Sequence, residues 1–146
     1  MSAFQNTQAV LREADALYAP YSCPATAECC QLTARGKEPW LYAPEWELLM
    51  DALEAHERPL PPERPDGACP FLDAAGHRCT VYAARPLGCR TFFCHRRTGP
   101  QKEPPAANMD ALIRRLEATA AVGEETPSPK PLSEWHRLSV AMRQAG

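Results

Sequence analysis

Seven cysteines are the residues of this 146-residue sequence that are best suited to chemistry. Thiolate sulfur is a soft, negatively charged ligand that suits zinc, iron and iron–sulfur centres. The cysteines form two groups, and a long stretch without cysteine separates them. These groups are Cys23, Cys29 and Cys30, and then Cys69, Cys79, Cys89 and Cys94. We predict that the chain folds back on itself so that both groups bind one metal centre.

Turn-forming residues lie beside the cysteines, at Pro24, Pro70, Gly76, Pro86 and Gly88. A tetrahedral site needs ligands on converging turns, and these residue types favour turns. Neither group has the two-residue cysteine interval of ordinary zinc ribbons. The adjacent cysteines of the first group cannot easily ligate one ion from an extended backbone. They therefore either serve two neighbouring metals or leave one thiol facing the core.

Basic residues also flank the second cysteine group. They are Arg78, Arg85, Arg90, Arg96 and Arg97. Several thiolates on one divalent ion leave a net negative charge, which nearby guanidinium groups offset while they donate hydrogen bonds to sulfur. We expect Arg85 and Arg90 to have this role, and Arg96 and Arg97 to lie in solvent. The aromatic residues Phe71, Tyr82, Phe92 and Phe93 are expected to pack around the centre.

Disulfides and simple burial explain the cysteines less well. The first twenty residues lack a basic segment followed by an apolar one, so we expect no signal peptide, and no apolar run is long enough to span a membrane. We therefore expect a cytoplasmic protein, in which thiols stay reduced. Burial as a small hydrophobic residue would explain a single cysteine, but not seven in one part of the chain.

Apolar periodicity predicts the elements that must position these residues. We expect helices over 3–18, from Pro44 to His56, from an N-cap at Asn108 to about 121, and after Ser133. Their expected apolar residues are Trp46, Leu49, Met50 and Leu53, then Met109, Leu112, Ile113 and Leu116, then Trp135, Leu138 and Met142. The carboxylates Glu45, Glu47, Glu54 and Glu57 are predicted to form a solvated helix face. Two short strands, 70–72 and 80–82, are expected to pair across a turn at 74–76.

The proline content limits the fold class. Sixteen prolines are about twice the average usage of roughly 5 %, which disfavours long helices and wide sheets. We expect a small, loop-rich, single α+β domain with helices around an irregular, cysteine-built metal centre. Residues 1–20 would form an N-terminal helix, 21–96 the cysteine-cluster metal-binding domain, and 97–146 a C-terminal helical extension with proline-rich linkers.

The sequence Cys69-Pro70-Phe71-Leu72, followed by Cys79-Thr-Val-Tyr82-Ala-Ala-Arg85-Pro86-Leu-Gly-Cys89-Arg90-Thr-Phe92, resembles a motif of the YkgJ-like cysteine-cluster family of zinc- or iron-chelating domains. That family's first motif has two cysteines separated by two residues, then two more residues and a cysteine pair. Here Thr26 replaces its second cysteine. The resemblance covers roughly residues 21–95.

The resemblance implies metal binding by the cysteines that match the two motifs, which are Cys23, Cys29, Cys30, Cys69, Cys79 and Cys89. A threonine hydroxyl is a poor ligand for soft metals, so we expect Cys94 to supply the thiolate missing at Thr26. The neighbouring histidines His77 and His95 are candidate additional ligands, although a solvent-facing or hydrogen-bonded histidine is commoner. We assign no role to His56 or His136.

The predicted function is therefore metal binding, with zinc or iron, the latter alone or in an iron–sulfur cluster. The alternatives are an iron–sulfur redox or oxidoreductase component, and a metal carrier or protein-interaction module. A net charge of −2 without a charged tail favours neither nucleic acid nor a membrane surface as a partner. A protein partner is not indicated, and no catalytic residue is nominated, so the sequence leaves open whether the protein is an enzyme.

Overall fold

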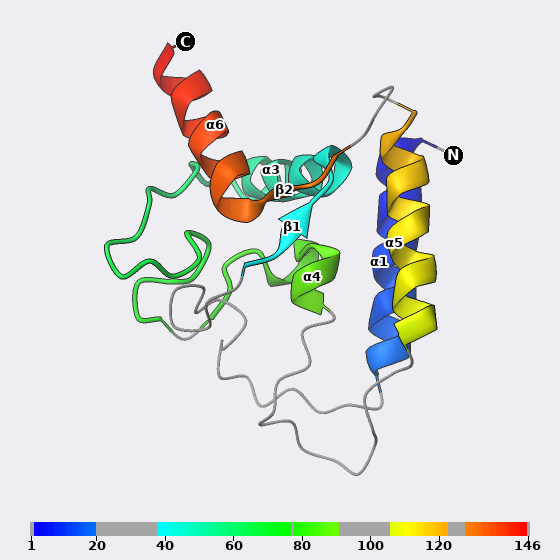
Figure 1. Ribbon diagram of the computed structural model, residues 1–146. Coiled ribbons are helices and arrows are strands. Elements are labelled where there is room, and N and C mark those ends of the chain that lie inside the picture. Colours follow the sequence, from blue (N-terminus) through cyan, green and yellow to red (C-terminus); the bar gives the residue numbers. More distant parts are fainter. Residues whose placement is uncertain (1, 20–37, 77, 91–105, 123–127, 146) are drawn as a thin grey trace.

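Helices make up most of the regular structure in the computed structural model, which describes residues 2–19, 38–76, 78–90, 106–122 and 128–145 (Figure 1). In chain order the elements are α1 (Ala3–Tyr18), β1 (Trp40–Leu41), α3 (Ala43–Ala55), the 3-10 helix η2 (Tyr82–Ala84), α4 (Leu87–Arg90), α5 (Ala106–Ala120), β2 (Lys130–Pro131) and α6 (Leu132–Ala145). Helices with one small sheet confirm the predicted α+β class.

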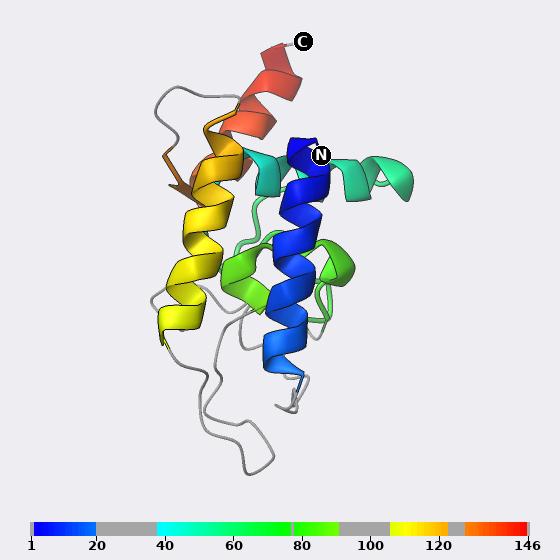
Figure 2. The same ribbon diagram turned by 90° about the vertical axis from the view of Figure 1, so that its right-hand side faces the viewer.

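Helices α1 and α5 lie side by side and run in opposite directions (Figures 1 and 2). The start of α1 is set by a capping box, in which the Ser2 hydroxyl accepts from the backbone N–H of Gln5 at 3.1 Å. Val10, Leu11 and Ala14 are buried against apolar residues of α5. The amphipathic helix predicted over 3–18 is thereby confirmed.

Helix α3 begins one residue before the predicted Pro44, after the N-cap Tyr42. Trp46, Leu49 and Leu53 are buried, and Met50 is partly buried against the same cluster, so the predicted apolar face is confirmed. The prediction for Glu45 is wrong. Its side chain is only 1 % exposed, whereas Glu47, Glu54 and Glu57 are exposed as predicted.

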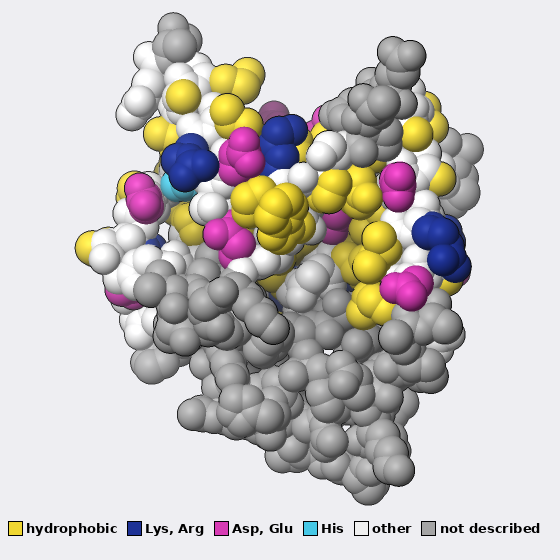
Figure 3. All heavy atoms as spheres, in the orientation of Figure 1, with side chains coloured by type: hydrophobic (Ala, Val, Ile, Leu, Met, Phe, Trp, Pro, Cys, Tyr) yellow, Lys and Arg dark blue, Asp and Glu magenta, His cyan; other side chains and the backbone are white. Residues whose placement is uncertain are grey.

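A two-stranded antiparallel sheet joins distant parts of the chain. Trp40 pairs with Pro131 and Leu41 with Lys130, and Leu132 N–H donates to the Pro39 carbonyl at 3.0 Å. Hydrophobic side chains reach the surface over this pair, with charges of both signs around them (Figure 3). Sequence patterns did not predict the sheet, because two-residue strands are too short to show an alternation.

The predicted hairpin of 70–72 and 80–82 is reduced to one antiparallel bridge between Leu72 and Cys79. Gly76 makes the turn with φ +78°, a conformation that glycine adopts without a steric cost. Residues from Tyr82 onward form η2 rather than a strand, so the second predicted strand is wrong. The turn predicted at 74–76 does lie between the two bridged residues.

The C-terminal helices differ from prediction in detail. Helix α5 begins at Ala106, so Asn108 lies inside it rather than at its N-cap, and α6 begins at Leu132, ahead of Ser133. Ile113 is 40 % exposed, and Leu138 and Met142 are 46 % and 75 % exposed, so these three are not core residues. Trp135 does pack inward, with its ring stacked on that of Trp46 at a centroid distance of 6.3 Å.

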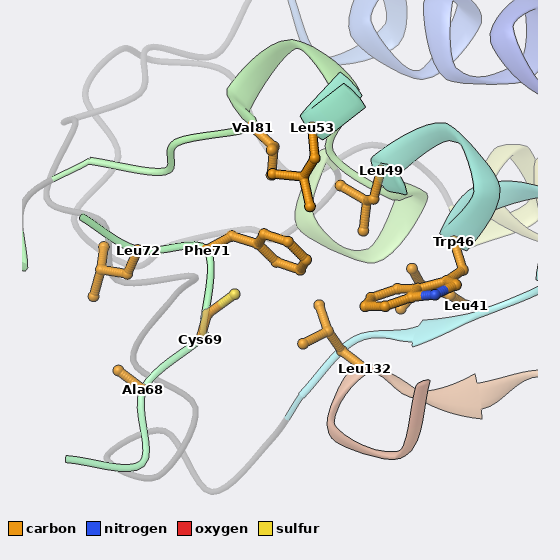
Figure 4. Packing of buried hydrophobic residues seen from close by; sticks show 10 residues of the cluster. All are labelled: Leu41, Trp46, Leu49, Leu53, Ala68, Cys69, Phe71, Leu72, Val81 and Leu132. Carbon is orange, nitrogen blue, oxygen red and sulfur yellow. The ribbon is translucent and has the colours of Figure 1, made fainter. Parts of the chain in front are cut away.

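Two hydrophobic clusters hold these elements together. One joins α1 and α5 to Tyr42, Leu48 and Leu87. The other joins α3 to the start of α6 and to the loop that carries Cys69 (Figure 4). In that view the sulfur of Cys69 points toward the side of the cluster occupied by Phe71 and Leu132. The second cluster therefore places a thiol beside the apolar core.

Candidate metal centre

Three of the predicted ligands, Cys69, Cys79 and Cys89, line one small cavity. They come from three separate stretches: the loop before the Leu72–Cys79 bridge, the bridge itself, and α4. Leu49, Phe71, Val81, Arg85, Pro86 and Leu132 complete the cavity wall. The cavity offers about 10 Å³ to a water-sized sphere, which is room for about one small species.

The loop before the bridge fixes Cys69, whose side chain is 5 % exposed. Arg64 forms an ion pair with Asp66 at 2.8 Å, and its Nη1 also donates to the Asp73 carbonyl at 2.8 Å. Leu72 N–H closes a turn on the Cys69 carbonyl at 3.0 Å. Arg64 therefore connects the part of the loop before Cys69 to the part after it.

Cys79 is half-buried and pairs in the antiparallel bridge with Leu72, which lies on the same loop as Cys69. Thr80 donates twice to the Phe71 carbonyl, through its N–H at 2.8 Å and its Oγ1 at 2.6 Å. On the other side of Cys79, the Arg78 carbonyl accepts a hydrogen bond from Asp73 N–H at 2.8 Å. These bonds fix the register that puts two cysteine-bearing segments beside each other.

Cys89 lies on α4, and a buried carboxylate fixes the start of that helix. Glu45 Oε2 accepts from Leu87 N–H at 2.8 Å, and Glu45 Oε1 accepts from Tyr42 N–H at 3.0 Å. Burial raises the pKa of Glu45 to about 7, while these two hydrogen bonds and the charge of Arg90 act in the opposite direction. Sequence reasoning missed this residue because a glutamate at a helix start is usually solvated.

Arg90 follows Cys89 directly and clamps the surrounding backbone. Its Nε donates to the Arg85 carbonyl at 2.6 Å and its Nη2 to the Ala83 carbonyl at 2.7 Å, and its Nη1 pairs with Asp15 of α1. Burial lowers the pKa of Arg90, whereas the negative charges of Asp15 and of the Cys89 thiolate favour its charged form. The charge-offsetting role expected for Arg90 toward a metal centre stays a prediction.

Two further arginines lie near the cysteines: Arg85 lines the same cavity, and Arg64 interacts electrostatically with Cys69. The guanidinium of Arg85 lies 3.7 Å over the Tyr82 ring and donates to the Tyr82 carbonyl at 2.9 Å. Tyr82 is 54 % exposed, so it does not pack around the centre as predicted, whereas Phe71 does. The hydrogen bond with Asp66 contributes most to raising the pKa of Arg64, and the charges of Asp66, Asp73 and Cys69 act in the same direction. Arg64 lies outside the motif, and its proximity to Cys69 depends on the loop turning back.

The donor chemistry of this cavity fits zinc or iron, because three thiols line one largely apolar enclosure. Among the described residues, however, no three His, Cys, Asp or Glu side chains form a group able to hold a metal ion. The other predicted ligands, Cys23, Cys29, Cys30 and Cys94, lie outside the described residues, as do His77 and His95.

Comparison with known proteins adds one match. The sequence model of the CxxCxxCC family, described as "Putative zinc- or iron-chelating domain", matches residues 22–117. No curated protein and no solved structure matches the chain. Within the described residues, no helix is long and apolar enough to cross a membrane.

Proposed function

Since this chain belongs to the CxxCxxCC family of zinc- or iron-chelating domains, we propose that its cysteines bind one zinc or iron centre that organises the middle of the fold. The observation that carries this proposal is the common cavity of Cys69, Cys79 and Cys89. The match to the family spans both groups of cysteines, which supports a centre shared between them.

In this proposal Cys69, Cys79 and Cys89 supply part of the ligand set, and Cys23, Cys29 and Cys30 complete it. Cys94 takes the place of the cysteine that Thr26 replaces. The adjacent thiols of the first group either serve two neighbouring metals or leave one facing the core. Ligation by both groups would close a long loop of chain around the metal.

The surroundings of the cavity suit such a centre chemically. A cysteine thiol loses its proton and becomes a negatively charged thiolate when it binds a divalent ion, and the positive charges of Arg64 and Arg90 lie where they favour that form. The apolar side chains of Leu49, Phe71 and Val81 line the cavity and lower the local dielectric constant, which strengthens these interactions. Metal binding would therefore stabilise the fold of a chain that has only a small core.

The identity of the metal, and how firmly it is held, distinguish three candidate functions: a structural centre, a redox centre and a metal carrier. Colourless protein with firmly held, stoichiometric zinc supports a structural centre. A brown colour with visible absorption supports an iron–sulfur cluster and a redox role. Metal that exchanges readily with a chelator supports a carrier, with the exposed helices available to a protein partner. We propose the structural centre, because Cys69 is buried in the core cluster and Cys79 packs against that cluster.

The test is elemental analysis with an optical spectrum on protein purified without oxygen, followed by removal of the metal with a chelator. We expect stoichiometric zinc or iron, and a lower unfolding midpoint after chelation. Cys69→Ser should lose metal, whereas the matched control Ala68→Ser, at a buried neighbour that is not a ligand, should keep it. Protein that binds neither metal, or a Cys69→Ser variant with full metal content, would contradict the proposal.

A further inference from the structure

Glu45 is a buried carboxylate that joins two helix starts. Its side chain is 1 % exposed, and its two oxygens accept from the backbone N–H groups of Tyr42 and Leu87. The first bond is local and belongs to the capping box of α3. The second reaches forty-two residues along the chain, to the first residue of α4. One side chain thus connects the start of α4 to the start of α3.

Helix α4 needs contacts with other elements to keep its position. It has four residues, and helices of that length are unstable unless tertiary contacts support them. At the start of the helix, the N–H groups of Cys89 and Arg90 both donate to the Pro86 carbonyl at 3.1 Å. The N–H of Leu87 has no intrahelical acceptor available at this helix start, and Glu45 accepts from it. The orientation of Cys89 therefore depends on contacts from outside α4.

Close packing reinforces this dependence. Leu87 is buried in the α1–α5 cluster. Gly88 lies so close to Pro39 that a Cβ at position 88 would come within 2.9 Å of the proline Cβ. The segment between Leu87 and Cys89 is consequently held on one side by Pro39 and on another by the Glu45 carboxylate. A small rotation of α4 would move the Cys89 sulfur relative to Cys69 and Cys79.

We propose that Glu45 is a positioning residue that holds Cys89 in the geometry required for metal binding, an inference that rests on the proposed function. A carboxylate is needed because it offers two acceptor oxygens, whereas a glutamine at this position has only one. Burying a charged group costs free energy, and rules of local stability are broken most often at functional sites. The raised pKa of Glu45 is a measure of that cost.

Two measurements on the full chain test this role. The first compares zinc affinities of the wild type, Glu45→Gln and the control Glu47→Gln by competition with a chromophoric chelator; Glu47 is exposed on the same helix. The second follows alkylation of metal-free protein by peptide mass spectrometry, with Cys69 and Cys89 measured in the same sample. A purely structural role would raise the alkylation rates of both cysteines together.

We expect Glu45→Gln to weaken zinc binding about tenfold, the lower end of the range for groups that orient ligands. Alkylation of Cys89 should accelerate by a similar factor while that of Cys69 stays unchanged, and Glu47→Gln should behave as the wild type. Affinity of Glu45→Gln within about twofold of the wild type, or equal acceleration at both cysteines, would overturn the inference.

If Glu45→Gln does not fold, Glu45→Asp replaces it, because it keeps the charge but is too short to span both N–H groups. The same two outcomes then decide. A wild-type protein that binds no zinc or iron would refute the proposed function, and with it this inference. Wild-type binding combined with unaltered Glu45→Gln would refute the inference alone.

Discussion

Arg90 of α4 and Asp15 of α1 form an ion pair at 2.5 Å, and the arginine side chain is only 8 % exposed. Because Arg90 follows Cys89, this ion pair connects the segment that carries Cys89 to the antiparallel pair of helices α1 and α5. The ion pair therefore adds a polar connection between α1 and the segment that carries Cys89, beside the packing of Leu87 against α1.

Replacing Arg90 with lysine should destabilise the protein by about 1–3 kcal/mol, because the compact ammonium cannot reach two carbonyls and a carboxylate at once. Urea unfolding measures this change. The control is Arg114→Lys at an exposed position of α5, which should stay within about 0.5 kcal/mol of the wild type. Equal effects of the two substitutions would show that Arg90 does not act as a clamp.

The buried carboxylate of Glu45 predicts a pH-dependent stability. Its pKa is about 7 in the folded chain and about 4.3 in an unfolded one, so the folded state holds the extra proton between these values. Stability should therefore fall as the pH rises through this range and level off above about 7. Since one pKa unit corresponds to about 1.4 kcal/mol, the loss is of the order of 3 kcal/mol.

Urea unfolding of reduced, metal-free wild type and Glu45→Gln measures this effect, and the comparison cancels the titration of all other groups. The stability of the wild type relative to the variant should be larger near pH 5 than near pH 8. A difference that is the same at both pH values would show that Glu45 titrates normally.

The close approach of Gly88 to Pro39 predicts that Gly88→Ala is damaging. The new methyl group would press on both the Cβ and the Cα of Pro39, so α4 must shift, at a cost of about 1–3 kcal/mol. Zinc affinity should fall with it, because Cys89 moves. Gly76→Ala is the comparison, since it strains a positive φ but meets nothing within 4 Å.

Gly76→Ala should therefore lower the free energy of unfolding, by about 1 kcal/mol, while changing zinc affinity less than Gly88→Ala. Chelator competition and thermal unfolding on both variants decide the point. If the two substitutions weaken zinc binding equally, the position of α4 is not specifically important for the metal.

The proposed substitution of Cys94 for the cysteine missing at Thr26 predicts a compensating pair. Cys94→Ser should lower metal content in the natural sequence, because it removes a ligand. Thr26→Cys should raise affinity, and Cys94→Ser should then be tolerated. Metal content that is unchanged by Cys94→Ser in the natural background would refute the substitution.

Periodic elements and the cysteine motif were predictable, whereas the contacts between distant residues were not. The apolar spacing of Val10, Leu11 and Ala14 predicted α1, and the motif predicted that Cys69, Cys79 and Cys89 act together. The burial of Glu45 could not be predicted, because it depends on α4 packing against α3. The sheet of Trp40 with Pro131 was equally hidden, since its strands are too short to carry a pattern.

Exposure on the C-terminal helices was also mispredicted, for a physical reason. Leu138 and Met142 follow the spacing of a buried helix face, but α6 packs mainly through its first turns, where Leu132 is buried and Trp135 stacks on Trp46. Periodicity identifies which face of a helix is apolar. It does not indicate how much of that face another element covers.

The most direct test of the central claim is a zinc titration of the reduced, metal-free chain, with alkylation of every cysteine followed by peptide mass spectrometry. If the two groups share a centre, zinc should protect Cys23, Cys29 and Cys30 at the same metal equivalents that protect Cys69, Cys79 and Cys89. Cys69→Ser should then weaken protection in both groups. Protection of one group alone, with the other reacting as in metal-free protein, would contradict the account.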